Sequence, residues 1–358
     1  MTIHESQRIE DHIKFWKKEK PSKPLVSFYI GNYFFASHYK AAKPLLVNGK
    51  KITPAMIDVD AFLEDYERRY TEINKLDQSG FWVAEPYTGI PWREAFWGCS
   101  VIAGENGFSA KPCIQDIHEL ENLRFSLDNP WVQKYFEFIK KLNALSAGRF
   151  PVGQPIMRGQ GDLLGALLGQ REFIYALYEE PAAVRKFNEK ALDAFFLVNE
   201  EMHKINPPFL GGTSIGFYHI WAPGKCIWYQ EDSCAFLSPD LYKEFLLETE
   251  KRICTEYDYT LVHLHPSSFY ILDAMLTNKK LGVVEINKDI GGPNVMEMLP
   301  QYKKVLDSGT RLMIWGDLTK EEIRFIFDTL PAEGIFLNIV TPDFASAQRL
   351  SEFIKTLA

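Results

Sequence analysis

The chain has 358 residues, 46% of them hydrophobic, and a formal net charge of −7 at pH 7, which are ordinary values for a globular protein. It contains no Lys/Arg-rich run, which argues against nucleic acid as the main partner. The apolar runs are too short to span a membrane, and the start of the chain lacks the pattern of a signal peptide. The five cysteines contain no CxxC pair, so we expect reduced thiols and a cytoplasmic protein.

The first part of the chain alternates helical and strand-like patterns. An amphipathic helix is predicted over 4–19, a strand over 23–31, a helix over 54–76 and a strand over 79–85. The next segment opens with prolines, glycines and aromatic residues, which is typical of a compact loop over a pocket. We therefore expect an insertion around 86–128.

The middle of the chain continues this alternation with one ambiguity. A helix over 130–146, a strand over 149–157 and two helical stretches over 171–205 follow in order. The segments 208–216 and 226–232 then compete for the fourth strand. The sequence leaves this choice open.

From residue 259 onward the strand–helix unit repeats four times with short links. The predicted strands cover 259–265, 281–287, 310–316 and 334–340, and the predicted helices cover 268–278, 291–306, 319–330 and 342–357. The strands are apolar on both faces, which is the pattern of a parallel sheet between helices. Eight such units predict an α/β protein with a (β/α)8 TIM barrel, a single domain over 1–358 with an N-terminal helix. A doubly wound sheet is the alternative, but no linker marks the topological break that it needs.

Two histidines stand at alternate positions where one predicted strand ends, in the segment Tyr259–Ser268. Alternate residues of a strand face the same side, so we expect His263 and His265 to project together. Two imidazoles at a strand end suit metal binding or proton transfer. The alternative is that one histidine packs in the core and the other caps the loop.

The candidate site residues stand at the C-terminal ends of the predicted strands, where TIM barrels carry their active sites. The candidates for catalysis are Glu85, Asp232, His263 and His265. The candidates for substrate binding are Asn32, Tyr33, Trp97, Arg158, Gln230, Trp315 and Asn338. An aromatic pocket would raise the pKa of Glu85 and favour a general acid, whereas a cap is the alternative. Asp232 could instead hydrogen-bond a loop, Arg158 could pair with a neighbouring acid, and the tryptophans could pack in the core.

One acidic segment carries a resemblance to a known family. Residues 230–245, QEDSCAFLSPDLYKEF, are similar to the D-x5-S-P-x-x-[FY]-x-x-F segment of the uroporphyrinogen decarboxylase superfamily. Supporting motifs are GQREFIYALY at 169–178, HLH at 263–265 and WGD at 315–317. The resemblance runs from about residue 60 to the end of the chain, and it implies a (β/α)8 barrel.

The two branches of this superfamily differ in chemistry, and the chain departs from both. The decarboxylases carry an Arg-rich motif after the first strand, where this chain has Gly31-Asn-Tyr-Phe-Phe35. The methyltransferases hold zinc with an H-x-C pair and a later Cys, where this chain has His263-x-His265 and no Cys after the last strand. His263, His265 and Glu285 could form an altered Zn²⁺ site, because imidazole and carboxylate groups both bind Zn²⁺. Such a site would leave one coordination position open.

Three functions follow as hypotheses. The first is a methyltransferase-like enzyme that moves a methyl group from a small methylated compound to a corrinoid carried by a partner protein. The second is a cofactor-free decarboxylase, a lyase of an aromatic or pyrrolic, uroporphyrinogen-like acid, with Arg158 or Arg93 against the carboxylate. The third is a non-catalytic barrel that binds a flat ligand. The missing Arg motif favours the first, and barrels of this type often form homodimers.

Overall fold

The computed structural model describes residues 3–21, 23–31 and 38–357. Asn32 and Tyr33, two of the expected substrate-binding residues, lie outside the described residues. Within the described ranges, no helix is both long enough and apolar enough to cross a membrane.

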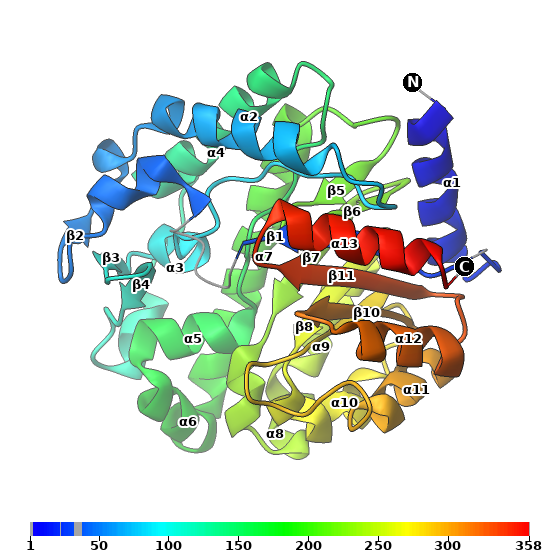
Figure 1. Ribbon diagram of the computed structural model, residues 1–358. Helices are drawn as coiled ribbons and strands as arrows, with labels where there is room; N and C mark the ends of the chain where they lie inside the picture. The colour runs from blue at the N-terminus through cyan, green and yellow to red at the C-terminus, as the bar shows by residue number, and fades with distance from the viewer. Residues whose placement is uncertain (1–2, 22, 32–37, 358) are drawn as a thin grey trace.

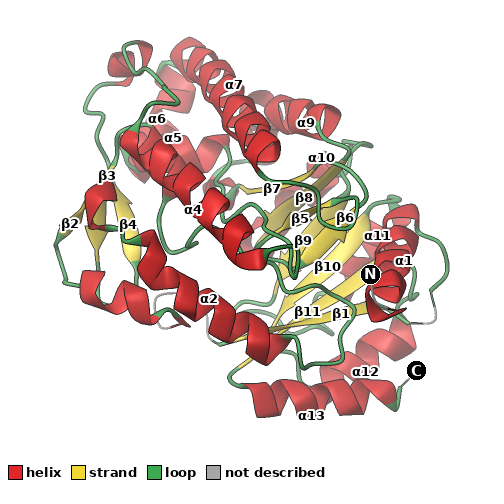
Figure 2. Ribbon diagram, turned by 90° about the horizontal axis from the view of Figure 1, so that it is seen from above, coloured by secondary structure: helices red, strands yellow, loops and turns green. Residues whose placement is uncertain are grey.

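A curled sheet of six parallel strands forms the centre of the molecule, and helices pack around it (Figures 1 and 2). The strand order is β1–β11–β10–β9–β8–β7. The strands are β1 Leu25–Ile30, β7 Cys226–Gln230, β8 Tyr259–Leu264, β9 Val283–Asn287, β10 Arg311–Gly316 and β11 Ile335–Thr341. Because every neighbouring pair is parallel, the carboxyl ends of all six strands lie at one edge of the sheet.

The central strands are buried on both faces, as their apolar sequences predicted. In β1, Val26 and Phe28 belong to the large core between the sheet and the helices, whereas Leu25 and Tyr29 belong to a second core inside the curl. Successive side chains of a strand point to opposite faces, so one strand feeds both cores. The inward-facing side chains of the strands therefore lie inside the curl, where the polar ones among them can form a functional site.

Most helices follow the predicted pattern, although the helix expected over 291–306 begins only at Leu299. The helices are α1 Ile3–Lys17, α2 Val59–Ile73, α3 Trp92–Phe96, α4 Pro130–Ser146, α5 Gln160–Leu168, α6 Gln170–Glu179, α7 Pro181–Ile205, α8 Pro239–Phe245, α9 Leu247–Glu256, α10 Leu272–Met275, α11 Leu299–Asp307, α12 Lys320–Thr329 and α13 Phe344–Lys355. Short 3₁₀ helices are η2 Lys40–Leu45, η3 Pro54–Met56, η4 Ile117–Glu121, η5 Asp232–Phe236 and η6 Pro266–Ile271. The two helical stretches expected over 171–205 are confirmed as α6 and α7, and Pro181 begins the second.

Two predicted strands are not continuous strands in the structure. The segments 79–85 and 149–157 are joined by a single parallel bridge between Ala84 and Val152, and the second segment reaches β7 through a bridge between Arg158 and Gln230. Proline at positions 151 and 155 removes backbone N–H donors, which interrupts a ladder. A full barrel of eight regular strands is therefore not confirmed, since the described residues form a continuous parallel sheet of six.

The remaining strands form two small antiparallel sheets. One contains β2 Lys51–Ile52, β3 Ser100–Ala103 and β4 Phe108–Lys111, at one edge of the molecule (Figure 2), so the expected insertion contains regular structure. The other pairs β5 Thr213–Ile215 with β6 Ile220–Ala222. The competition for the fourth strand is thus decided in favour of 226–232, which supplies β7 to the central sheet.

Candidate functional site

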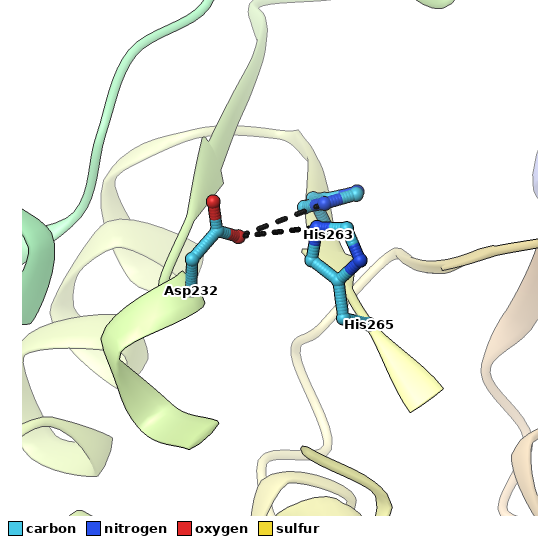
Figure 3. Close-up of side chains that lie close together, drawn as sticks. All are labelled: Asp232, His263 and His265. Carbon is cyan, nitrogen blue, oxygen red and sulfur yellow. Dashed lines mark ion pairs between the residues drawn. The ribbon is translucent and has the colours of Figure 1, made fainter. Parts of the chain in front are cut away.

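Three side chains from neighbouring strand ends converge on one point (Figure 3). Nε2 of His263 lies 3.6 Å from Oδ1 of Asp232, and Nε2 of His265 lies 3.7 Å from the same oxygen. One possible ligand atom from each of the three residues lies within 4.8 Å of the others. The side chain of His263 is 10% exposed and that of Asp232 is 40% exposed, so the cluster opens to solvent on the Asp232 side.

Strand geometry explains this convergence. His263 is paired in register with Gln230 of the neighbouring strand β7, and Asp232 follows two residues later as the first residue of η5. His265 comes directly after β8 and keeps an extended backbone, so it projects on the same side as His263. Nε2 of Gln230 donates a hydrogen bond of 2.8 Å to Oδ2 of Asp232, which leaves Oδ1 toward the two imidazoles.

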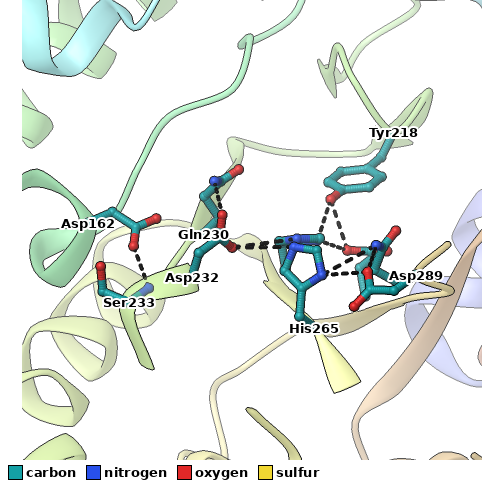
Figure 4. A network of polar contacts seen from close by, with 10 residues as sticks. Asp162, Tyr218, Gln230, Asp232, Ser233, His265 and Asp289 are labelled. Atoms are coloured by element: carbon teal, nitrogen blue, oxygen red, sulfur yellow. Dashed lines mark hydrogen bonds and ion pairs between the residues drawn. The ribbon is translucent and has the colours of Figure 1, made fainter. Parts of the chain in front are cut away.

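The other ring nitrogen of each histidine contacts a second carboxylate (Figure 4). Nδ1 of His263 contacts Oε2 of Glu285 and lies 2.9 Å from the hydroxyl of Tyr218, which donates to Glu285 at 2.8 Å. Nδ1 of His265 lies 2.6 Å from Oδ1 of Asp289. Each ring is therefore fixed through its Nδ1 atom by a carboxylate, and its Nε2 atom is directed at Asp232.

This arrangement fits a metal ion. Metal-binding histidines commonly present one nitrogen to the metal and hydrogen-bond the other to a carboxylate. Ligands at about 2.0–2.1 Å from a tetrahedral Zn²⁺ stand about 3.3 Å apart, close to the observed separations from Asp232. The expected ligand set of His263, His265 and Glu285 needs a correction, because Glu285 lies behind His263. Asp232 could take the third position instead, and a fourth would then be left for solvent or substrate.

The acidic neighbours determine the charge of the metal-free cluster. Burial lowers the pKa of His263, but the charge and hydrogen bond of Glu285, with the charge of Asp232, raise it to about 9. Burial and Glu285 also raise the pKa of Tyr218 well above its usual value, so this phenol remains a hydrogen-bond donor. A metal ion bound at His263 would replace a proton there.

Two residues beside the cluster, Asp289 and Tyr218, escaped the sequence analysis. Asn287 ends β9, its amide contacts Asp289, and Asp289 stands two residues beyond it. Polar residues at alternate positions where a strand ends are the signal that identified His263 and His265. The same signal, at 285, 287 and 289, could have identified Asp289. Tyr218 lies between β5 and β6, where no local pattern points to the site.

Glu85, the expected general acid, is buried apart from the three-residue cluster. Its Oε2 has no hydrogen-bond partner among the described residues. Burial raises the pKa of Glu85 well above its usual value, against the opposing charge of Arg69. The expected rise in pKa is thus confirmed, whereas a role in catalysis stays a prediction.

The structure places Trp97 and Arg158 outside the cluster. Trp97 packs between Phe125 and Phe187, with ring centroids at 5.8 and 5.1 Å, and Nε of Arg158 forms an ion pair of 2.8 Å with Glu94. These contacts favour core packing for Trp97 and pairing with a neighbouring acid for Arg158.

Trp315 and Asn338 lie inside the curl of the sheet. The ring centroid of Trp315 is 5.4 Å from that of Phe217, and the amide of Asn338 donates to the backbone carbonyl of Tyr218 at 3.1 Å. Asn338 therefore supports the segment that carries Tyr218, and Trp315 belongs to the aromatic wall beside it.

Comparisons with known proteins place the fold. No protein-family model and no curated protein matches the sequence. Solved structures do match, and one of them is a methyltransferase from Methanosarcina mazei, with a TM-score of 0.68 and 13% sequence identity. The match covers 98% of this chain and 99% of that chain. At this identity the likeness shows a shared fold over nearly the whole chain.

Proposed function

We propose that the chain is a metal-dependent, methyltransferase-like enzyme of the uroporphyrinogen decarboxylase superfamily with a (β/α)8-type barrel. The observation that carries the proposal is the convergence of His263, His265 and Asp232, with a second carboxylate behind each ring. The fold shared with a methyltransferase and the motifs at 230–245 and 263–265 support the same choice.

The described side chains would divide the work as follows. Asp232, His263 and His265 would hold a Zn²⁺ ion, which supplies a Lewis acid for a small substrate when bound. Glu285 and Asp289 orient the imidazoles and keep their Nε2 atoms available. The open fourth position would receive the substrate, a small methylated compound.

Exposed apolar side chains lie on the segments next to the cluster and support a protein partner there. Phe236 at the end of η5 is 64% exposed, and Ile290, next to Asp289, is 78% exposed. Tyr270 on η6 is also exposed and hydrogen-bonds to the backbone of Cys234 in η5. Exposed apolar groups that lie close together are a feature of interaction sites. We propose that a corrinoid-carrying protein docks there and accepts the methyl group.

Metal analysis tests the proposal directly. Protein purified without added metal should contain about one zinc per chain, and the His263→Ala/His265→Ala double variant should contain none. The matched control is Asp240→Asn, an exposed carboxylate on α8 that should keep the metal. A metal-free parent that also fails to bind added Zn²⁺ would exclude a metal-dependent enzyme.

A decarboxylase remains the second candidate because of one observation, the buried carboxyl group of Glu85. The arginines first expected to bind a substrate carboxylate are engaged elsewhere. Arg158 pairs with Glu94, and Arg93 donates to the carbonyl of Ala191 and to Gln160. Release of CO₂ by metal-free protein would favour this candidate over methyl transfer.

A further inference from the structure

Arg69 on α2 is a buried cation without a carboxylate partner among the described residues. It is 8% exposed, and it donates a long hydrogen bond of 3.4 Å to the carbonyl of Ile30, at the end of β1. Its guanidinium lies over the rings of Tyr29 and Tyr39, at 6.0 and 5.6 Å from their centroids. A guanidinium has five N–H donors, and a buried charge is normally paired. Most N–H donors of Arg69 therefore have no hydrogen-bond acceptor among the residues that the structure describes.

Glu85 is a second group near Arg69 with an unused atom. The two side chains form no ion pair, yet the charge of Arg69 acts on Glu85 against the effect of burial. Oε2 of Glu85 is buried and has no hydrogen-bond partner among the residues described. The backbone carbonyl of Glu85 accepts a hydrogen bond from Tyr66, which anchors the residue to α2, the same helix that carries Arg69.

A series of aromatic rings in contact runs from Arg69 to the cluster of Asp232, His263 and His265. Tyr29, which lies under Arg69, has its ring centroid 5.6 Å from that of Phe217. The ring of Phe217 is 5.0 Å from that of Tyr218, whose hydroxyl contacts His263. The guanidinium of Arg69 contacts the carboxyl end of β1. The cluster lies at the carboxyl ends of β7 to β9, farther along the same edge of the sheet. Rings in contact therefore link Arg69 to the cluster.

We propose that Arg69 binds the carboxylate of a small organic acid, with Glu85 as a second hydrogen-bonding group. Arginine matches a carboxylate because two parallel N–H donors meet its two oxygens. A Glu85 in its acid form would donate to the same carboxylate instead of repelling it. That this acid is the substrate rests on the proposed function, but its binding at Arg69 does not require a metal.

Calorimetric titration with benzoate and benzamide tests the site, because the two probes share a ring and differ in charge. Wild-type protein should bind one benzoate per chain and should not bind benzamide comparably. Arg69→Met should weaken benzoate binding about tenfold or more, the loss of a charge-assisted interaction. Arg69→Lys, which keeps the charge but not the paired donors, should weaken it several-fold and covers the case in which Arg69→Met does not fold.

The matched control is Arg149→Met. Arg149 also lies over two rings, those of Tyr70 and Phe150, but it is paired with Glu67 at 2.7 Å. This variant should bind benzoate as the wild type does. Equal affinity in wild type and folded Arg69 variants, or no benzoate binding by the wild type, would overturn the proposal. Asp232→Ala should keep benzoate binding, so loss of the metal function and loss of the carboxylate site are distinguishable.

Discussion

The carboxylate of Glu231 caps the start of helix α5, where its Oε2 accepts the backbone N–H of Gly161 at 2.9 Å. Its other oxygen accepts the N–H of Gln160 at 2.5 Å. Unpaired N–H groups at a helix start attract a carboxylate. Because Glu231 directly precedes Asp232, this buried contact between distant segments fixes the backbone from which the proposed metal ligand projects.

The first prediction concerns Gly159, which precedes α5 and touches this carboxylate. A Cβ at Gly159 would clash with the side chain of Glu231, although the backbone there is not left-handed. Gly159→Ala should lower the free energy of unfolding by roughly 1–3 kcal/mol, the usual cost of overpacking, and should weaken metal binding. Urea denaturation measures the first effect. Gly107→Ala is the control, since a Cβ there meets nothing within 4 Å. Equal midpoints for both variants would show that Glu231 can move freely.

The second prediction separates the groups behind the imidazoles from the metal ligands. Glu285→Gln keeps the size of the side chain but removes the negative charge at Nδ1 of His263. Zinc affinity should fall about 10- to 100-fold, as for carboxylates that orient metal-binding histidines elsewhere, while a stoichiometric site remains. Competition with a chromogenic chelator measures the affinity. Glu297→Gln, which changes an exposed carboxylate, should leave it unchanged. No change in Glu285→Gln would argue that His263 is not a ligand.

The third prediction is a loss of stability in acid, caused by buried neutral histidines. Burial lowers the pKa of His12 from 6.5 to about 4, with a smaller opposing effect of its hydrogen bond to the carbonyl of Arg8 and a further lowering by the Arg8 charge. Its ring otherwise faces the rings of Phe81, Trp221 and Phe336. Below pH 6.5, His12 therefore binds a proton in the unfolded chain, whereas in the folded chain it becomes protonated only at about pH 4.

Stability from neutral His12 is thus fully present above pH 6.5 and is lost as pH falls toward 4, by roughly 3 kcal/mol at most. His203 and His219 act in the same direction, because burial lowers their pKa values to about 4 and about 3. Urea midpoints measured between about pH 7 and pH 4 should fall less steeply in His12→Gln than in the wild type. His118→Gln, at an exposed position, should keep the wild-type slope. Parallel slopes for all three proteins would contradict the assignment.

The fourth prediction tests the apolar side chains around the opening. Phe236→Ser and Ile290→Ser should keep zinc and the fold, because both side chains are mostly exposed. Methyl transfer to a corrinoid protein should fall several-fold through weaker docking, seen as a higher KM for the carrier with kcat retained. Leu197→Ser, an exposed apolar position on α7, is the control. Equal KM values in all variants would place the partner elsewhere.

Much of the architecture follows from local patterns. The apolar strands from residue 259 onward, each followed by a helix, appear as β8 to β11 close to the predicted bounds. The segments 79–85 and 149–157 carry similar apolar patterns but form only bridges. Prolines at 151 and 155 were visible in the sequence, yet their effect depends on which N–H groups a neighbouring strand needs. That need is set by the register of the whole sheet.

The common direction of His263 and His265 could be predicted from the chain alone, because side chains alternate along a strand with a period of two. Only the tertiary structure decides which carboxylate faces Nε2 of each histidine and which contacts Nδ1. The parallel register of β8 with β9 sets His263 opposite Glu285, and the register with β7 sets it opposite Gln230, next to Asp232. Register between strands arises from packing of the complete sheet against its helices, and no local pattern encodes it.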